Sequence, residues 1–331
     1  MRVIRIFLFP VSLVYALVVY LRNFLFDIDV FKGKSFKTPT ICVGNLSVGG
    51  TGKTPMIEFL IRLLSPEKSV AVLSRGYGRK SAGFQMATEA SAVELLGDEP
   101  FQIYSKFPAI PVAVDADRKN GISILESTIS PDVILLDDAF QHRKVSPKFA
   151  ILLTAYDGLY VDDWYLPTGH LRDGKKEAKR ADLIIVTKCP ELISEAKQQQ
   201  ITRKLAPLKH QKVLFSYLKY ATTILNEQRS LSLEALKNKK ITLVTGIANP
   251  EPLVTFLTQY GIEVLHLRYR DHHFFSKEEI ALFNTKDFIV TTEKDYVRLK
   301  GKVNELYYIA IAHEFKGNGK QLIASALNEI L

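Results

Sequence analysis

Short apolar runs alternate with longer amphipathic stretches along most of the chain, a pattern typical of a parallel sheet whose two faces are covered by helices. The first series of apolar runs predicts strands at 40–43, 69–73, 111–114, 133–136, 150–153 and 183–186. Helical stretches fit between them, for example at 55–64, 118–127 and 191–205. We therefore expect an α/β fold with a mostly parallel sheet.

A second α/β series follows a region of weaker pattern at 208–232, where polar and β-forming residues mix. This series predicts strands and helices at 241–244, 250–260, 262–267, 277–283, 288–291, 306–311 and 319–331. The last of these is a closing amphipathic helix. We therefore expect a larger domain at 31–207, a linker at 208–232 and a smaller α/β domain at 233–331.

The chain begins with an almost wholly apolar stretch, from Ile6 to Leu21, which has arginines on both sides. This stretch is shorter than the roughly 20 residues that cross a bilayer core. A signal peptide would need a small-residue cleavage site, which is missing here, and a buried core helix is a further alternative. We expect residues 1–30 to form a membrane-associated helix, with Arg22 and nearby lysines facing anionic headgroups. Whether the helix spans the bilayer or lies in its interface stays open.

Charge and cysteine content narrow the class of protein. The chain of 331 residues carries a formal net charge of +9, which favours a nucleotide, a nucleic acid or an acidic membrane surface as partner. Its basic residues are dispersed and form no aromatic-interleaved tract, so we expect no nucleic-acid partner. Cys42 and Cys189 stand far apart, as expected for reduced thiols in a cytosolic compartment.

A glycine-rich segment follows the first predicted strand and precedes the first predicted helix. Its backbone N–H groups are suited to wrap nucleotide phosphates, with Lys53 reaching the β/γ-phosphates and the Thr54 hydroxyl on Mg²⁺. The usual pattern begins with glycine at the position of Ser47, and a glycine turn without nucleotide is the alternative. We predict that ATP or GTP binds here, at Ser47, Val48, Gly49, Gly50, Thr51, Gly52, Lys53 and Thr54.

Two carboxylates, Asp137 and Asp138, end the predicted strand at 133–136. This arrangement holds or orients Mg²⁺ beside a phosphate loop. His142 and Arg143 follow shortly after, where a solvated loop is the simpler interpretation. In the turn at 166–173, Arg172 is placed to neutralise charge on a transferring phosphoryl group.

The residues alone leave the role of three further motifs open. Asp98 and Glu99 precede a proline, which suits either a catalytic base with a metal-linked acid or an ordinary helix cap. Arg75 lies in a glycine-rich turn that either grips an anion or is a plain surface turn. His272 and His273 precede two phenylalanines, as in a polar loop over an apolar patch.

Seven motifs spread over almost the whole chain together resemble the tetraacyldisaccharide 4′-kinases of lipid A biosynthesis. They lie at 44–55, 74–78, 97–100, 137–142, 166–172, 271–273 and 292–295. The resemblance implies a P-loop NTPase-like kinase domain that uses ATP and Mg²⁺. It also implies transfer of the γ-phosphate to the 4′-hydroxyl of tetraacyldisaccharide 1-phosphate, giving lipid IVA, at the cytoplasmic face of the inner membrane. No obligate protein partner is expected.

The resemblance also implies roles for individual residues. Asp98 is expected to be the base for the acceptor hydroxyl, positioned by His272 or His273, and Lys53 and Arg172 complete the catalytic set. The expected Mg²⁺ residues are Thr54, Glu99, Asp137 and Asp138, and the expected substrate-binding residues are Arg75, Arg118 and His142. Two positions depart from the family pattern: His170 stands where proline is common, and Asp173 where glutamate is usual. The shorter side chain puts a direct metal or substrate role of Asp173 in doubt.

Two rival functions fit parts of the sequence. A membrane-associated P-loop GTPase, acting as a switch or a metallochaperone, would read guanine with a motif of the form Asn/Thr-Lys-x-Asp. The chain has Thr187 and Lys188 of such a motif, but Pro190 stands where the aspartate would be. A nucleic-acid-binding ATPase is suggested by the positive charge alone.

Overall fold

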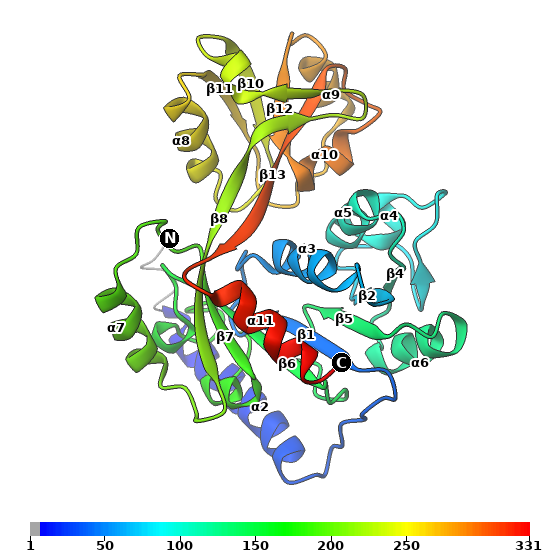
Figure 1. The fold of residues 1–331 in the computed structure, drawn as a ribbon, viewed down its shortest axis with the longest axis vertical. Coiled ribbons are helices and arrows are strands. Elements are labelled where there is room, and N and C mark those ends of the chain that lie inside the picture. Colours follow the sequence, from blue (N-terminus) through cyan, green and yellow to red (C-terminus); the bar gives the residue numbers. More distant parts are fainter. Residues whose placement is uncertain (1–6) are drawn as a thin grey trace.

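The computed structural model describes residues 7–331, which build one 13-stranded sheet with helices packed along it (Figure 1). The strands follow the order β11-β10-β12-β13-β8-β7-β6-β1-β5-β2-β4-β3, and β9 pairs with β8. Most neighbours are parallel; the antiparallel pairs are β13 with β8, β8 with β9, and β3 with β4. The predicted α/β fold with a mostly parallel sheet is confirmed.

The strands of the larger part carry the phosphate loop. They are β1 (Thr40–Asn45), β2 (Val70–Ser74), β3 (Gln85–Met86), β4 (Val112–Val114), β5 (Val133–Asp137), β6 (Phe149–Ala155) and β7 (Leu183–Thr187). The helices around them are α3 (Lys53–Leu64), α4 (Val93–Leu96), α5 (Asp98–Lys106), α6 (Arg118–Thr128), α7 (Glu195–Leu205) and α11 (Gly319–Asn328), with 3-10 turns at Tyr160–Asp162 and Lys175–Arg180. The helix predicted at 191–205 begins at Glu195, because the Ser194 side chain caps it by accepting from the Lys197 N–H.

The smaller part has its own strands and its own apolar core. Its elements are a 3-10 turn (Leu233–Leu236), β10 (Lys240–Thr245), α8 (Glu251–Gln259), β11 (Glu263–Arg268), α9 (Lys277–Phe283), β12 (Ile289–Thr292), α10 (Glu293–Leu299) and β13 (Leu306–Phe315). A capping box at Ser276 and Glu279 starts α9 where its sequence predicts a helix. Buried residues such as Leu243, Leu257 and Val290 form this core.

Two long strands connect the parts, as Figure 1 shows. The segment 208–232 contains β8 (Lys212–Leu225) and β9 (Ser230–Ser232). The first residues of β8 pair in parallel with β7, and its later residues pair antiparallel with β13. The chain returns along β13 to α11, whose Ile323 and Leu327 pack into the core of the larger part.

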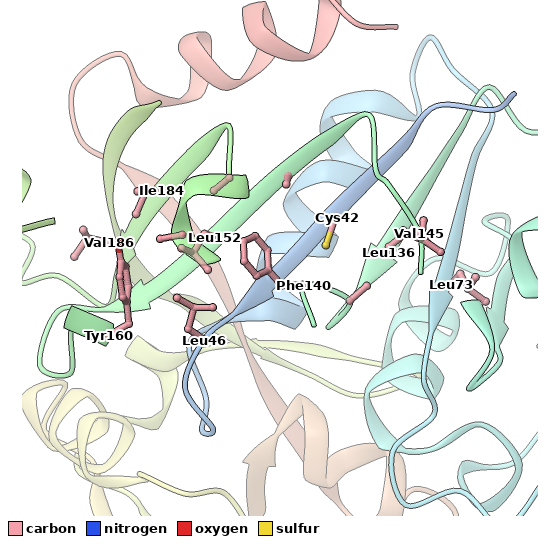
Figure 2. Packing of buried hydrophobic residues seen from close by; sticks show 14 of the residues in the cluster. Cys42, Leu46, Leu73, Leu136, Phe140, Val145, Leu152, Tyr160, Ile184 and Val186 are labelled. Atoms are coloured by element: carbon pink, nitrogen blue, oxygen red, sulfur yellow. The ribbon is translucent and has the colours of Figure 1, made fainter. Parts of the chain in front are cut away.

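The core of the larger part lies on both faces of the sheet, since successive strand residues point to opposite faces. Ile41 and Val43 of β1 pack with residues of α3 and α11 on one face, and Cys42 packs on the other. Figure 2 shows the second layer, with Phe140 beside β1. Gly44 permits this approach, because a Cβ there would lie 2.6 Å from the Phe140 Cβ. The packing fixes the segment that directly follows Asp137, the last residue of β5, and Asp138.

The N-terminal helix α2 (Phe9–Asp27) packs on the larger part through few residues. Its buried positions are Ser12, Val19 and Asn23, whereas most of its apolar side chains are exposed. By length and composition α2 is suited to cross a membrane. The alternative of a buried core helix therefore does not describe it. The first six residues of the predicted segment 1–30, including Arg2, Arg5 and Ile6, lie outside the described residues.

Candidate active site

The phosphate loop connects β1 to α3 and depends on backbone angles that glycine allows. Gly49 has a φ of 117° and Gly52 a φ of 86°, in the region that side chains disfavour. Ser47, which stands where the usual motif has glycine, donates a hydrogen bond to Asp163 Oδ2 at 3.1 Å. The Asn45 side chain donates to the Thr51 hydroxyl at 3.0 Å. These contacts hold the predicted phosphate loop at the N-terminus of α3.

Asp138 lies directly beside the loop. Lys53 Nζ is 3.7 Å from Asp138 Oδ1, and Arg172 Nη1 donates to Asp138 Oδ2 at 3.0 Å. Burial raises the pKa of Asp138, but the Lys53 charge and the Arg172 hydrogen bond outweigh it and lower the pKa to about 2. Arg172 also bonds the side chain of Asn45. The structure thus joins three predicted site residues, Lys53, Asp138 and Arg172.

Asp137 differs from its neighbour, because it is fully buried. Burial raises its pKa to about 7, and the charges of Glu99 and Asp138 add to this rise. Ser74 donates to Oδ2 at 3.0 Å, whereas Oδ1 has no hydrogen-bond partner among residues 7–331. An unpartnered carboxylate oxygen near the loop fits a Mg²⁺ ion. No group of three or more His, Cys, Asp or Glu side chains that could hold a metal occurs in the described residues. Mg²⁺ usually takes one or two carboxylates together with waters and substrate phosphates.

Asp98 meets the smaller part of the structure at the start of α5. The carboxylate accepts from His272 Nδ1 at 2.9 Å and from Arg298. Burial raises the pKa of Asp98, but the hydrogen bonds from His272 and Arg298 outweigh it and lower the pKa. His273 instead contacts Glu279 Oε2, at 2.8 Å from its Nε2. The choice between the two histidines, which the sequence left open, therefore falls on His272 as the contact of Asp98.

Sequence reasoning missed Arg298 and Lys294, two cations of α10. The Arg298 side chain is 3% exposed and lies between Asp98 and Asp295, whose Oδ1 is 3.1 Å from Arg298 Nη1. Lys294 Nζ lies 3.0 Å from His272 Nε2 and 3.7 Å from Glu99 Oε1. Lys294 lies in the motif at 292–295, to which the resemblance gave no role, and Arg298 lies outside every motif named above. Their role depends on contacts with α5, about 200 residues earlier in the chain.

The three predicted substrate-binding residues occupy different environments. Arg118 is 2% exposed and lies at the end of β5, where its Nη2 donates to the Asp137 carbonyl oxygen at 3.4 Å. Burial lowers the pKa of His142 to about 4, and the charges of Arg118 and Arg75 contribute. Arg75 itself is exposed. Of the three residues, Arg75 is thus the one that solvent or a ligand can reach.

The two positions that depart from the family pattern have structural partners. Asp173 is fully buried and accepts from Asn23 of α2 at 2.6 Å. The His170 N–H donates to Asp163 Oδ1 at 3.1 Å, a bond that a proline would lack. The Tyr15 hydroxyl of α2 also donates to the Arg172 carbonyl oxygen at 3.1 Å. Asp173 therefore anchors α2 to the turn that carries Arg172.

A parallel sheet whose first strand leads through a glycine-rich loop into a helix, with Lys53 beside the carboxylates of a neighbouring strand, defines a P-loop phosphotransferase. Comparison with known proteins specifies which one. The family model of tetraacyldisaccharide-1-P 4′-kinase matches residues 4–329, and the chain belongs to this family. The resemblance inferred from the sequence is thereby confirmed.

Individual relatives are similar to the chain over almost their whole length. The chain is 48% identical over 336 residues to the tetraacyldisaccharide 4′-kinase of Flavobacterium johnsoniae, covering 100% of this chain and 98% of that protein. It is 47% identical over 338 residues to the enzyme of the same name from Flavobacterium psychrophilum, with the same coverage of both chains. The crystal structure of LpxK from Aquifex aeolicus in complex with ATP superposes with a TM-score of 0.81 at 28% identity, covering 99% of each chain.

We predict that Arg298 stabilises the contact between α10 of the smaller part and α5 of the larger part. Arg298→Met should lower the free energy of unfolding by about 3–5 kcal/mol, because it leaves the buried Asp98 and Asp295 without their shared cation. Arg268→Met is the matched control in the same part of the chain, since Arg268 forms an exposed pair with Glu251 and should cost at most about 1 kcal/mol. Urea unfolding of both variants measures the difference, and equally small losses would contradict the prediction.

Proposed function

We propose that the protein transfers the γ-phosphoryl group of ATP to the 4′-hydroxyl of a tetraacyldisaccharide 1-phosphate, giving lipid IVA. Membership of the 4′-kinase family supports this reaction. The observation that carries the proposal is the contact of Asp98 with His272. Glu99, the neighbour of Asp98, is close enough to Asp137 for its charge to raise the Asp137 pKa. A carboxylate for the acceptor hydroxyl thus lies near the residues for the donor.

On the donor side, the loop at 47–54 binds the ATP phosphates through its backbone N–H groups and Lys53. Thr54, Asp137 and Asp138 are the residues that would hold Mg²⁺ directly or through water, with Glu99 nearby. When bound, the ion neutralises phosphate charge. Arg172, held by Asp138 and Asn45, is placed to stabilise charge on the transferring group.

On the acceptor side, Asp98 receives the proton of the sugar hydroxyl, which is a poor nucleophile near neutral pH. Its lowered pKa keeps the carboxylate ionised, and the hydrogen bond from His272 fixes its orientation. His273 holds the loop through Glu279 and is not assigned a direct role. Arg75 offers an exposed cation to an anionic substrate. Arg118 holds Asp137 through its carbonyl oxygen, and the lowered pKa of His142 keeps that side chain neutral.

Each part of the chain has its own role in the proposed reaction. Residues 31–207 form a nucleotide-binding domain, residues 208–232 a connection, and residues 233–331 a domain that supplies His272 and Arg298 to Asp98. Helix α2 places the protein on the cytoplasmic face of the inner membrane. Its exposed apolar side chains suit the bilayer interior, and the acylated substrate lies in the same membrane.

The reaction is tested by incubating the purified full chain with ATP and tetraacyldisaccharide 1-phosphate in detergent micelles. A phosphorylated product should form with ATP and should disappear in Lys53→Ala, because the loop then lacks its phosphate cation. Substitution of GTP for ATP tests the GTPase alternative, which family membership does not favour. Absence of product from folded protein would overturn the proposal.

We predict that Asp98→Asn lowers kcat by about 10²- to 10⁴-fold, because the amide cannot accept the hydroxyl proton. The KM for ATP should change little, since the phosphate loop is intact. His272→Gln should also lower kcat, and His273→Gln is the matched control that should lower it far less. Steady-state kinetics with both substrates measures these effects. A kcat of Asp98→Asn equal to that of the wild type would rule out the assigned base.

We predict that the exposed face of α2 binds membranes. The triple substitution Leu13→Gln, Leu17→Gln and Leu21→Gln changes one exposed stripe and keeps the buried Ser12 and Asn23. Co-sedimentation with anionic vesicles should fall at least about tenfold, because buried leucines each contribute about 1.5–3 kcal/mol. Leu192→Gln, at an exposed site far along the chain, should leave binding unchanged. Equal sedimentation of the triple variant and the wild type would defeat the prediction.

A further inference from the structure

His313 of β13 contacts the phosphate loop at the Gly52 carbonyl oxygen. Its Nε2 lies 2.9 Å from the Gly52 carbonyl oxygen, and its Nδ1 lies 3.1 Å from the Ser216 hydroxyl of β8. The residue is 4% exposed. We propose that His313 is a positioning residue of the nucleotide site, which holds the Gly52–Lys53 peptide so that the Lys53 N–H faces the phosphates. This inference rests on the proposed ATP site and deepens it.

The two partners of the ring define its protonation. A carbonyl oxygen only accepts hydrogen bonds, so Nε2 must carry the hydrogen that faces Gly52. Burial lowers the pKa of His313 to about 4, which leaves the ring neutral at physiological pH. Nδ1 of the neutral ring is therefore an acceptor, and the Ser216 hydroxyl donates to it. The ring is thus held in one tautomer and one orientation by Ser216 of β8 on one side and the Gly52 carbonyl of the phosphate loop on the other.

The orientation of the Gly52 carbonyl decides where the next N–H points. A trans peptide is planar, so its C=O and N–H point in opposite directions. The Gly52 carbonyl also accepts from the Met56 N–H at 3.1 Å, as the first acceptor of α3. The Lys53 N–H, one of the first N–H groups of the helix, is thereby directed away from His313 and out of the helix N-terminus. N–H groups in this position bind phosphate.

Because residue 52 is glycine, the orientation of the Gly52–Lys53 peptide depends on contacts such as the one with His313. Gly52 has a φ of 86°, and a Cβ there would lie 2.9 Å from His313 Nε2, so the close contact needs glycine. Glycine also leaves the peptide orientation weakly determined by the backbone itself. The preceding carbonyl has a similar support, since the Thr187 hydroxyl donates to the Thr51 oxygen at 2.8 Å. Two successive carbonyls of the loop are thus held from β7 and β13.

The test compares two variants of equal size, His313→Gln and His313→Met, in the full chain. Glutamine retains an N–H donor near the position of Nε2, and methionine does not. His313→Met should raise the Kd for a non-hydrolysable ATP analogue and the KM for ATP by about three- to tenfold, the effect of one hydrogen bond. His313→Gln should restore both to within about twofold. The KM for the lipid acceptor should not change in either variant.

Ser216→Ala gives a second measurement that leaves the ring in place. It removes the donor to Nδ1 and should raise the Kd for the analogue less than His313→Met does. Wild-type ATP affinity in His313→Met, or equal losses in the Gln and Met variants, would overturn the inference, because the ring would then act by its shape alone. Failure of the wild type itself to bind the analogue would instead refute the proposed ATP site, with Lys53→Ala as the non-binding reference.

Discussion

Parallel pairing of β1 with β5 is the constraint on which the site depends. The register places Val43 opposite Asp137, so the carboxyl ends of the two strands lie at the same edge of the sheet. The phosphate loop follows one strand and Asp138 the other, which brings Lys53 and Asp138 to 3.7 Å from each other. A slip of the register would separate them and turn buried side chains of β1 to the wrong face. The apolar layers on both faces therefore maintain the chemistry as well as the fold.

Opposite environments give neighbouring carboxylates different properties. Asp138 meets Lys53 and Arg172 and stays ionised, whereas burial next to other acids raises the pKa of Asp137 to about 7. Asp98 is kept ionised by His272 and Arg298, which come from the smaller part of the chain. The larger part alone would present Asp98 without these partners. The environment of Asp98 is thus complete only when both parts of the chain are present, joined through β8 and β13.

The exposed apolar helix α2 is connected to the same site. Ser12 and Thr168 are 2.7 Å apart between their hydroxyl oxygens, and Asn23 bonds the buried Asp173. These polar contacts attach α2 to the turn that carries Arg172, while its apolar residues face outward. The turn at 166–173 thus joins the exposed apolar helix to Arg172, which contacts Asp138 beside the phosphate loop.

The sequence alone determined the features that depend on neighbouring residues. Alternating apolar runs predicted most strands of both parts but not β3, β8 or β9, and β8 lies in the segment expected to be a linker. The glycine-rich loop with Lys53 and the adjacent Asp137 and Asp138 indicated a phosphate site. Tertiary structure decided which distant residues meet. His272 and not His273 contacts Asp98, and Arg298 contacts the same carboxylate. His313 contacts Gly52 of the phosphate loop, and Arg118 contacts the Asp137 carbonyl oxygen. Such contacts join residues up to 261 positions apart. No local pattern encodes them, because they arise only when the two long strands bring the end of the chain back to its beginning.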